Sequence, residues 1–242
     1  MYVPGRHMYV PDGHTRRATR YHGETGRQLA HETEEHMDHV KRMLEGLPYL
    51  PADETLTAQR EACARKLFAF NHLPPERWGE RPALLRGILG HVGANPEVNA
   101  PLLCDYGYNI HVGDDFYANY NLVVLDAAPV RIGDHCFIAP NVAIYTAGHP
   151  LHADPRNRGY EYALPVTIGH NVWIGGNSVI LPGVSIGDNA VIGAGSIVNR
   201  DVPANTLAVG NPCRPIRHIT EDDRCLYRTG HAFDFPFSAA TP

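Results

Sequence analysis

The chain has 242 residues, of which 43% are hydrophobic and 19% charged, and its 21 Lys and Arg against 26 Asp and Glu give a formal net charge of −5. This composition is typical of a folded globular protein, and the negative charge argues against a nucleic-acid partner. No apolar leader and no uninterrupted apolar span is visible, so we expect a cytoplasmic protein without a membrane partner. The five cysteines contain no C-x-x-C pair, which indicates reduced thiols.

Residues 1–30 are expected to form a disordered tail, because a near-duplication, MYVPGRH and then MYVPDGH, leads into an Arg-rich stretch. A metal- or anion-binding arm is the alternative, since six of the 15 His precede Val40.

Residues 31–95 are predicted to be a helical cap. A first short helix places Met37, Val40, Leu44 and Leu47 on one face. A second helix follows Asp53, a suitable N-cap, and its inner face is Leu56, Cys63, Leu67 and Phe70. A third helix is expected from about Pro75 to Val92.

After Gly93 an aliphatic residue or alanine recurs at a spacing of six residues, with two extra residues before Ile132 and a break between Ile144 and Val166. The positions are Val112, Ala118, Val124, Ile132, Ile138, Ile144, Ile168, Ile174, Ile180, Ile186, Ile192 and Val198. Neither a strand nor a helix has this period, so the pattern indicates a repeat architecture. Three hexads predict an 18-residue coil of three short strands, with one aliphatic side chain per strand pointing inward and Gly, Asn or Asp at the corners. The fold class is therefore mainly β, with a parallel β-helix over residues 96–205.

The repeat is interrupted by a polar insert over residues 145–165, which carries His149 and His152. A long excursion from a strict solenoid is typically functional. Residues 206–242 are expected to form a C-terminal tail.

Several stretches resemble hexapeptide-repeat acyltransferases, within them the maltose and galactoside O-acetyltransferases and related nodulation acetyltransferases. The most specific are CDYGYNIHVGDDFYANYN (104–121), VRIGDHCFIAPNV (130–142), YTAGHP (145–150) and GNPCRPIR (210–217). The resemblance covers about residues 36–219. It implies a left-handed parallel β-helix, acetyl-CoA as co-substrate, a sugar acceptor, no required metal, and a homotrimer.

Acetyl transfer to a neutral hydroxyl needs a base and donors for the tetrahedral oxyanion. The resemblance places the general base at His149, with direct transfer in a ternary complex. His152 has no motif support and is expected to be an ordinary loop residue.

For the acceptor, the resemblance implies Asp105 and Asn119, and Asp126 as a substitute for an acidic ligand that falls at Ala127 here. The alternative for Asp105 and Asn119 is that these corner residues only satisfy backbone N–H groups. A second acidic ligand of the galactoside branch falls at Pro51, beside Asp53. These departures favour a maltose- or glucose-like acceptor.

For the donor, the resemblance implies contacts from small residues along a groove, from an indole near the thioester, and from cationic groups near the CoA end. These residues are Trp173, Gly176, Ala194, Asn199, Arg200, Arg214 and Arg217.

Three alternatives stay open. The first is another acceptor: a galactoside, a nodulation-type oligosaccharide or an antibiotic. The second is a zinc-dependent carbonic-anhydrase-like enzyme that uses some of His135, His149, His152 and His170. The third is a non-catalytic β-helix scaffold.

Overall fold

The computed structural model describes residues 38–235, so the predicted tail at 1–30 and the first apolar position, Met37, lie outside the described residues. Residues 39–235 belong to one compact unit. None of the helices in this described part is long and apolar enough to cross a membrane.

The helical segment comes first and contains α2 (His39–Leu44), α3 (Glu54–Asn71), a 3₁₀ turn η1 (Pro75–Glu80) and α4 (Arg81–Ile88). Asp53 caps α3 as predicted: its carboxylate accepts from the N–H groups of Thr55 and Leu56. All four residues expected on the inner face of α3 are buried. The third helix is shorter than predicted, because the chain turns at Gly90, whose N–H bonds to the carbonyls of Gly107 and Ile110 and leads into the first strand.

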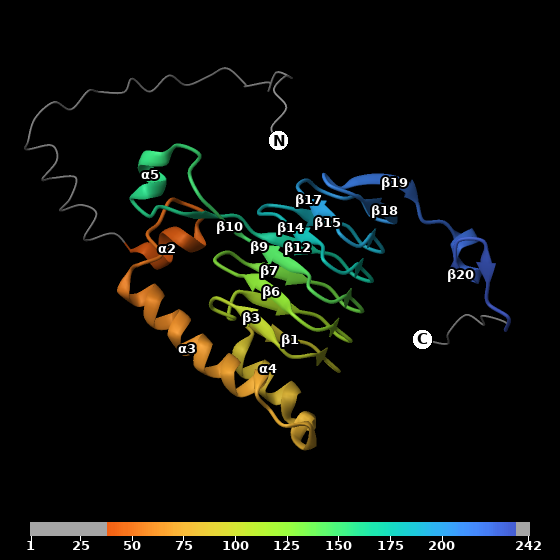
Figure 1. Cartoon of the computed structure of the whole chain (residues 1–242), viewed down its shortest axis with the longest axis horizontal. Helices are drawn as coiled ribbons and strands as arrows, with labels where there is room; N and C mark the ends of the chain where they lie inside the picture. Colours follow the sequence, from red (N-terminus) through yellow and green to blue (C-terminus); the bar gives the residue numbers. More distant parts are fainter. Residues whose placement is uncertain (1–37, 236–242) are drawn as a thin grey trace, which may run out of the picture. The chain divides into compact units, whose positions relative to one another are not determined.

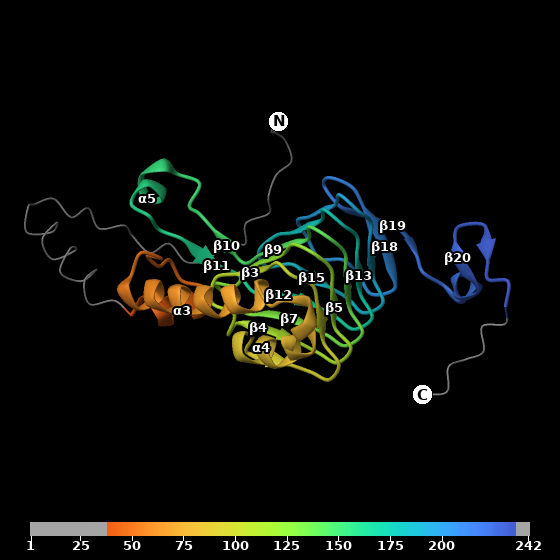
Figure 2. The same cartoon turned by 60° about the horizontal axis from the view of Figure 1, so that its bottom comes forward.

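The remainder is a prism of three parallel sheets, visible along its length in Figure 1 and more nearly end-on in Figure 2. The first sheet contains β1 (His91–Val92), β4 (Ile110–Val112), β7 (Val130–Ile132), β12 (Val166–Ile168) and β15 (Ser185–Ile186). The second contains β2 (Glu97–Val98), β5 (Tyr117–Ala118), β8 (Phe137–Ile138), β13 (Trp173–Ile174), β16 (Val191–Ile192), β18 (Thr206–Val209) and β19 (Arg214–His218). The third contains β3 (Leu102–Cys104), β6 (Leu122–Leu125), β9 (Ala143–Tyr145), β14 (Val179–Ile180) and β17 (Ile197–Val198).

The predicted fold class, a left-handed parallel β-helix of hexapeptide repeats behind a helical segment, is confirmed. The inward aliphatic residues of successive coils pair in register, such as Ile138 with Ile174 and Ile174 with Ile192, and all three are fully buried. This continuous stack is the core, and burying each large aliphatic side chain contributes about 1.5–3 kcal/mol.

The corners explain the recurrent asparagines. Asn121, Asn141 and Asn177 lie at matching corners with φ near +60°, a conformation that asparagine tolerates better than most residues. Their side chains also bond from coil to coil: the Asn121 amide donates to Asn141 at 2.9 Å. Asparagine therefore serves both the backbone geometry and the stacking.

We call the corner between the second and third sheets the second edge, and the corner between the third and first sheets the third edge. The insert leaves at the third edge as an antiparallel ribbon of β10 (Ala147–Gly148) and β11 (Tyr162–Ala163), with α5 (Ala153–Asn157) near its tip (Figure 1).

The β-helix extends further than the predicted boundary at residue 205. β18 adds a strand to the second sheet, and β19 pairs antiparallel with it and closes the stack. Short inward side chains, Thr206 and Ala208, replace the Ile-Gly signal there, so the repeat is not visible in the sequence. A turn η2 (Glu221–Cys225) and a hairpin, β20 (Leu226–Arg228) with β21 (His231–Ala232), follow.

Candidate active site

His149 lies at the base of the projecting ribbon, directly after β10, and its side chain is 55% exposed. Its Nε2 lies 3.6 Å from Oε1 of Glu161, and its Nδ1 lies 3.4 Å from the carbonyl oxygen of Tyr160. When Nδ1 carries the proton toward that carbonyl, Nε2 has a free lone pair beside a carboxylate. This arrangement suits a general base, because the carboxylate stabilises the imidazolium formed by proton transfer.

Glu161 is itself held by Tyr49, and the sequence argument did not identify either residue. The Tyr49 hydroxyl donates to Oε2 of Glu161 at 2.8 Å, and the two backbones exchange N–H···O bonds at 2.9 and 3.0 Å. Burial and the nearby carboxylate raise the pKa of Tyr49, so its hydroxyl keeps its proton. Tyr49 precedes α3 and Glu161 lies in the insert, and nothing in a linear sequence joins positions 112 residues apart.

Asp105 lies on the third edge, one residue after β3, and is partly buried. Burial and the Asp126 carboxylate raise its pKa to about 6, while Arg60 acts in the opposite direction. The insert that carries His149 and Glu161 leaves from the same edge, after β9. Asp105 therefore offers hydrogen-bonding oxygens on the same side of the molecule as His149.

Asp126 follows β6 on the same edge, but its side chain is fully buried. Its Oδ1 accepts from the N–H groups of Asp105 and Tyr106, and its Oδ2 is buried without a hydrogen-bond partner. Burial is also the main cause that raises its pKa. A fully buried carboxylate does not reach a substrate at the surface, so this geometry argues against the predicted direct contact. Asp126 instead fixes the backbone that carries Asp105.

Arg60 on α3 completes this cluster, and it too was missed by the sequence argument. Its guanidinium donates to the hydroxyl of Tyr106 at 2.8 Å, to the carbonyl of Pro51 at 2.7 Å and to the hydroxyl of Thr57 at 3.1 Å. The bond to Tyr106 ties the helical segment to the third edge, and the other two hold the guanidinium in place.

The other predicted acceptor and groove residues lie on a different edge. Asn119, Gly176 and Ala194 follow β5, β13 and β16, so they line the second edge. Gly176 and Ala194 lie on neighbouring levels of the stack, and the level of β8 separates them from Asn119. The Asn119 side chain accepts from the N–H of Tyr120, which leaves its amide group available. Two of these three residues carry no side chain larger than a methyl group, so an extended chain can approach the backbone there.

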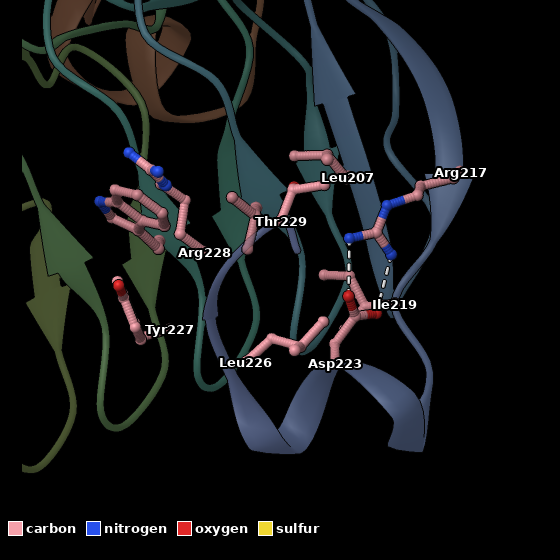
Figure 3. A pocket seen from close by; sticks show the side chains of 10 residues that line it. Leu207, Arg217, Ile219, Asp223, Leu226, Tyr227, Arg228 and Thr229 are labelled. Carbon is pink, nitrogen blue, oxygen red and sulfur yellow. Dashed lines mark hydrogen bonds and ion pairs between the residues drawn. The ribbon is translucent and has the colours of Figure 1, made fainter. Parts of the chain in front are cut away.

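Trp173 and Arg217 lie together in a pocket of about 230 Å³, with Leu207, Ile219, Asp223 and the start of the β20 hairpin around it (Figure 3). Figure 3 also shows the two bonds, both 2.7 Å, from the Arg217 guanidinium to the Asp223 carboxylate. Trp173 is 53% exposed. The fork of Arg217 is therefore engaged within the chain, while Trp173 presents an open indole.

Arg214, Asn199 and Arg200 lie near the C-terminal end of the stack. The Arg214 guanidinium donates to the side-chain oxygen of Asn199 at 3.2 Å and to the carbonyl of Cys213 at 2.6 Å. Arg200 follows Asn199 in the chain and is exposed. The hydrogen bond between Arg214 and Asn199 brings these two predicted donor-site residues together.

The histidines named for a zinc site do not converge within the chain. His149 and His152 belong to the insert, and His152 caps α5 through the N–H of Asp154. His135 and His170 lie at the corner between the first and second sheets, where they contact Asp115 and Asp134. Over residues 38–235 no group of three or more His, Cys, Asp or Glu is arranged to hold a metal.

Comparison with known proteins gives the family. A family model described as the maltose acetyltransferase hexapeptide capping motif matches residues 42–93, and the hexapeptide repeat of succinyl-transferase matches residues 165–200. The galactoside O-acetyltransferase of Escherichia coli is 44% identical over 191 residues, which cover 79% of this chain and 94% of that protein.

Two solved structures agree with this. A maltose O-acetyltransferase from Clostridium difficile 630 is 50% identical with a TM-score of 0.75, over 76% of this chain and 98% of that one. A galactoside acetyltransferase in complex with coenzyme A is 43% identical with a TM-score of 0.80, over 82% of this chain and 100% of that one. The family expected from the sequence motifs is confirmed: the chain belongs to the galactoside and maltose O-acetyltransferases, within the hexapeptide-repeat acetyltransferases.

Proposed function

We propose that the protein transfers the acetyl group of acetyl-CoA to a hydroxyl of a sugar, with a maltose- or glucose-like acceptor. The observation that carries this proposal is the arrangement of His149, Glu161 and Tyr49 at the base of the ribbon. A base supported by a fixed carboxylate is what deprotonation of a neutral hydroxyl needs. The names of the relatives support the donor and the class of acceptor.

In this mechanism acetyl-CoA supplies the reactive thioester. Asp105 accepts hydrogen bonds from sugar hydroxyls and orients the acceptor, while Asp126 holds the backbone of Asp105 in place. Nε2 of His149 takes the proton from the attacking hydroxyl, and the Glu161 carboxylate stabilises the positive imidazolium. Backbone N–H groups carry the oxyanion charge. The hydroxyl oxygen attacks the acetyl carbonyl directly, so no acetyl-enzyme forms. The C–S bond of the thioester then breaks, and His149 returns the proton to the departing thiolate sulfur.

For the donor, Gly176 and Ala194 provide a narrow path along the second edge, and Trp173 shields the thioester end. Arg214 with Asn199, and Arg200 beside them, provide hydrogen bonds and positive charge toward phosphates. Both terminal nitrogens of Arg217 donate to Asp223, so Arg217 contacts a phosphate only through N–H groups outside this pair.

The residues of the proposed site are divided between two edges of one prism. This division supports the assembly of several copies of the chain into an oligomer. His149 and Asp105 lie on the third edge, and Asn119, Gly176 and Ala194 on the second. One acceptor cannot contact both edges of the same chain through the core, but the third edge of one copy can face the second edge of the next. Three such contacts close a homotrimer of about 80 kDa, three times 26.7 kDa.

The outward side chains of the sheets support the same arrangement. The first sheet presents a polar column, His91, His111, Arg131, Thr167 and Ser185. The second presents Glu97 on its first strand and then Tyr117, Phe137, Trp173, Val191 and Leu207, and the third presents Leu103, Val123, Ala143, Val179 and Ile197. Two columns that are apolar apart from Glu97, beside one polar column, suit a subunit with two partner-facing sides.

The test is a screen of sugars with acetyl-CoA, followed by release of free CoA thiol and by the position of the ester in the product. We expect glucose and maltose to be acetylated faster than a β-galactoside. If no sugar hydroxyl gains an acetyl group, the proposed function is wrong. A cytoplasmic location also stays a prediction, and localisation of the tagged full-length chain tests it.

A further inference from the structure

Two cysteines from distant parts of the sequence meet beside the third edge. The Sγ atoms of Cys63 on α3 and Cys104 on β3 lie 3.6 Å apart. The remaining three cysteines contact no other thiol: Cys136 donates to the carbonyl of Gly169, Cys213 is buried elsewhere, and Cys225 is exposed. The sequence predicts five reduced thiols without joining these two, because a pair 41 residues apart has no linear signature.

The pair differs from an ordinary buried thiol because the two sulfurs contact each other and because one of the two cysteines is partly exposed to solvent. Cys63 is 3% exposed, whereas Cys104 is partly exposed at the end of a strand. The hydrogen bond between them lowers the pKa of Cys63 and raises that of Cys104. The two sulfurs are already in contact, as the formation of a bond between them requires.

We propose that Cys63 and Cys104 form a reversible dithiol–disulfide site that reacts with a small hydroperoxide. The hydroperoxide reaches the pair from the partly exposed Cys104 side. The Cys63 sulfur, which has more thiolate character, is oxidised to a sulfenic acid while the hydroperoxide is reduced to an alcohol, or to water for hydrogen peroxide. The Cys104 thiol then attacks this sulfenic acid, water leaves, and the disulfide forms. A dithiol reductant reverses the step by exchange.

The disulfide acts on the acceptor side of the proposed active site, and this part of the inference rests on the proposed function. A disulfide bond is about 2.05 Å long, so the two sulfurs must approach by about 1.5 Å. Cys104 is bonded directly to Asp105, and Cys63 lies one turn after Arg60 on α3. Drawing α3 and β3 together displaces Asp105, and a misplacement near 1 Å is enough to weaken a precise contact substantially.

The chemical part is tested in a Cys225→Ser background, which removes the exposed thiol and leaves four. The full-length protein is treated with hydrogen peroxide, quenched and denatured, and its free thiols are counted before and after reduction. We expect two thiols instead of four, a mass lower by two hydrogen atoms, and a single cross-linked peptide pair containing Cys63 and Cys104. Recovery of four free thiols, or a different cross-link, overturns the proposal.

Two further variants in the same background keep this test specific. Cys63→Ala removes one partner and is expected to show no disulfide under peroxide. Cys213→Ala removes a cysteine that is equally buried but has no thiol neighbour, and it is expected to form the Cys63–Cys104 disulfide normally. If Cys213→Ala also fails to form the Cys63–Cys104 disulfide, the disulfide depends on general packing and the assignment to this pair is wrong.

The functional part compares kinetics of the oxidised and reduced protein. We expect the KM for the sugar to rise by about tenfold on oxidation, with the KM for acetyl-CoA unchanged, and both values to be insensitive to peroxide in Cys63→Ala. Disulfide formation without a change in the sugar KM refutes the coupling to Asp105. If the reduced protein transfers no acetyl group, the proposed function is wrong. The thiol count and the peptide map still test the disulfide, because neither depends on acetyl transfer.

Discussion

The contact between His149 and Glu161 gives a quantitative prediction about the base. Glu161→Gln keeps the size of the side chain and its backbone bonds to Tyr49, but removes the negative charge that lies 3.6 Å from Nε2 of His149. The charge matters only after His149 has taken a proton. Its loss should therefore act on the chemical step and not on binding.

The size of the effect follows from Coulomb's law and from exposure. Two unit charges 3.6 Å apart interact by about 1 kcal/mol in bulk water and by about 5 kcal/mol at an effective dielectric constant of 20. The His149 side chain is 55% exposed and that of Glu161 20% exposed, so the value lies near the aqueous limit, at about 1–2 kcal/mol. This corresponds to a reduction in kcat of about 5–30-fold.

The assay is steady-state release of CoA thiol with a saturating sugar, with kcat and the KM for acetyl-CoA measured separately. Tyr49→Phe is the matched control: it keeps the carboxylate and removes only the hydroxyl that donates to it, so its kcat should fall less. If Glu161→Gln has the wild-type kcat, or if it changes only the KM for acetyl-CoA, the carboxylate does not assist the base.

Further predictions concern stability, assembly and donor binding. Because the pKa of Asp105 is raised to about 6 in the folded protein, the free energy of unfolding should fall by about 1–2 kcal/mol as the pH rises from about 4 to about 6. Asp105→Asn should remove this fall, as measured by urea unfolding at fixed protein concentration. Equal pH dependence in wild type and variant would contradict the shift. Asp53→Ala should cost about 1 kcal/mol because α3 loses its cap, whereas Glu54→Ala, next to it, should cost little. Val179→Glu, on the apolar third sheet, should dissociate the trimer in light scattering, whereas Thr167→Glu, on the polar first sheet, should not; a trimer in both variants places the interface elsewhere. Arg214→Ala should raise the KM for acetyl-CoA by about tenfold without changing the KM for the sugar.

The β-helix was predictable because its signal is local and repeated. Each inward position, from Val112 to Val198, reports the same environment every six residues, so a single missing position does not hide the pattern. The cap at Asp53 was also predictable, since capping depends on residues within one turn. Where the repeat ends, the signal fails: β18 buries Thr206 and Ala208 in place of large aliphatic side chains, and nothing local marks it as a strand of the prism.

The candidate site was predictable only in part, because its contacts join distant segments. The motif around His149 pointed to the base, but Tyr49 lies 112 residues from its partner Glu161, and Arg60 lies 46 residues from Tyr106. Asp126 shows the opposite problem. Its residue type suggested a ligand for substrate, whereas full burial and two backbone bonds make it a support for Asp105.

The central claim is that His149 is the base of a direct acetyl transfer, and His149→Ala tests it most directly. General-base catalysis is worth about 10²–10⁴-fold, so kcat with a good sugar acceptor should fall by at least about 100-fold while the Kd for CoA stays near the wild-type value. His152→Ala, in the same insert but at the cap of α5, should keep most of the activity. A fall in kcat of less than about tenfold in His149→Ala would show that another group takes the proton, and a parallel loss of CoA binding would show that the residue holds the fold of the site.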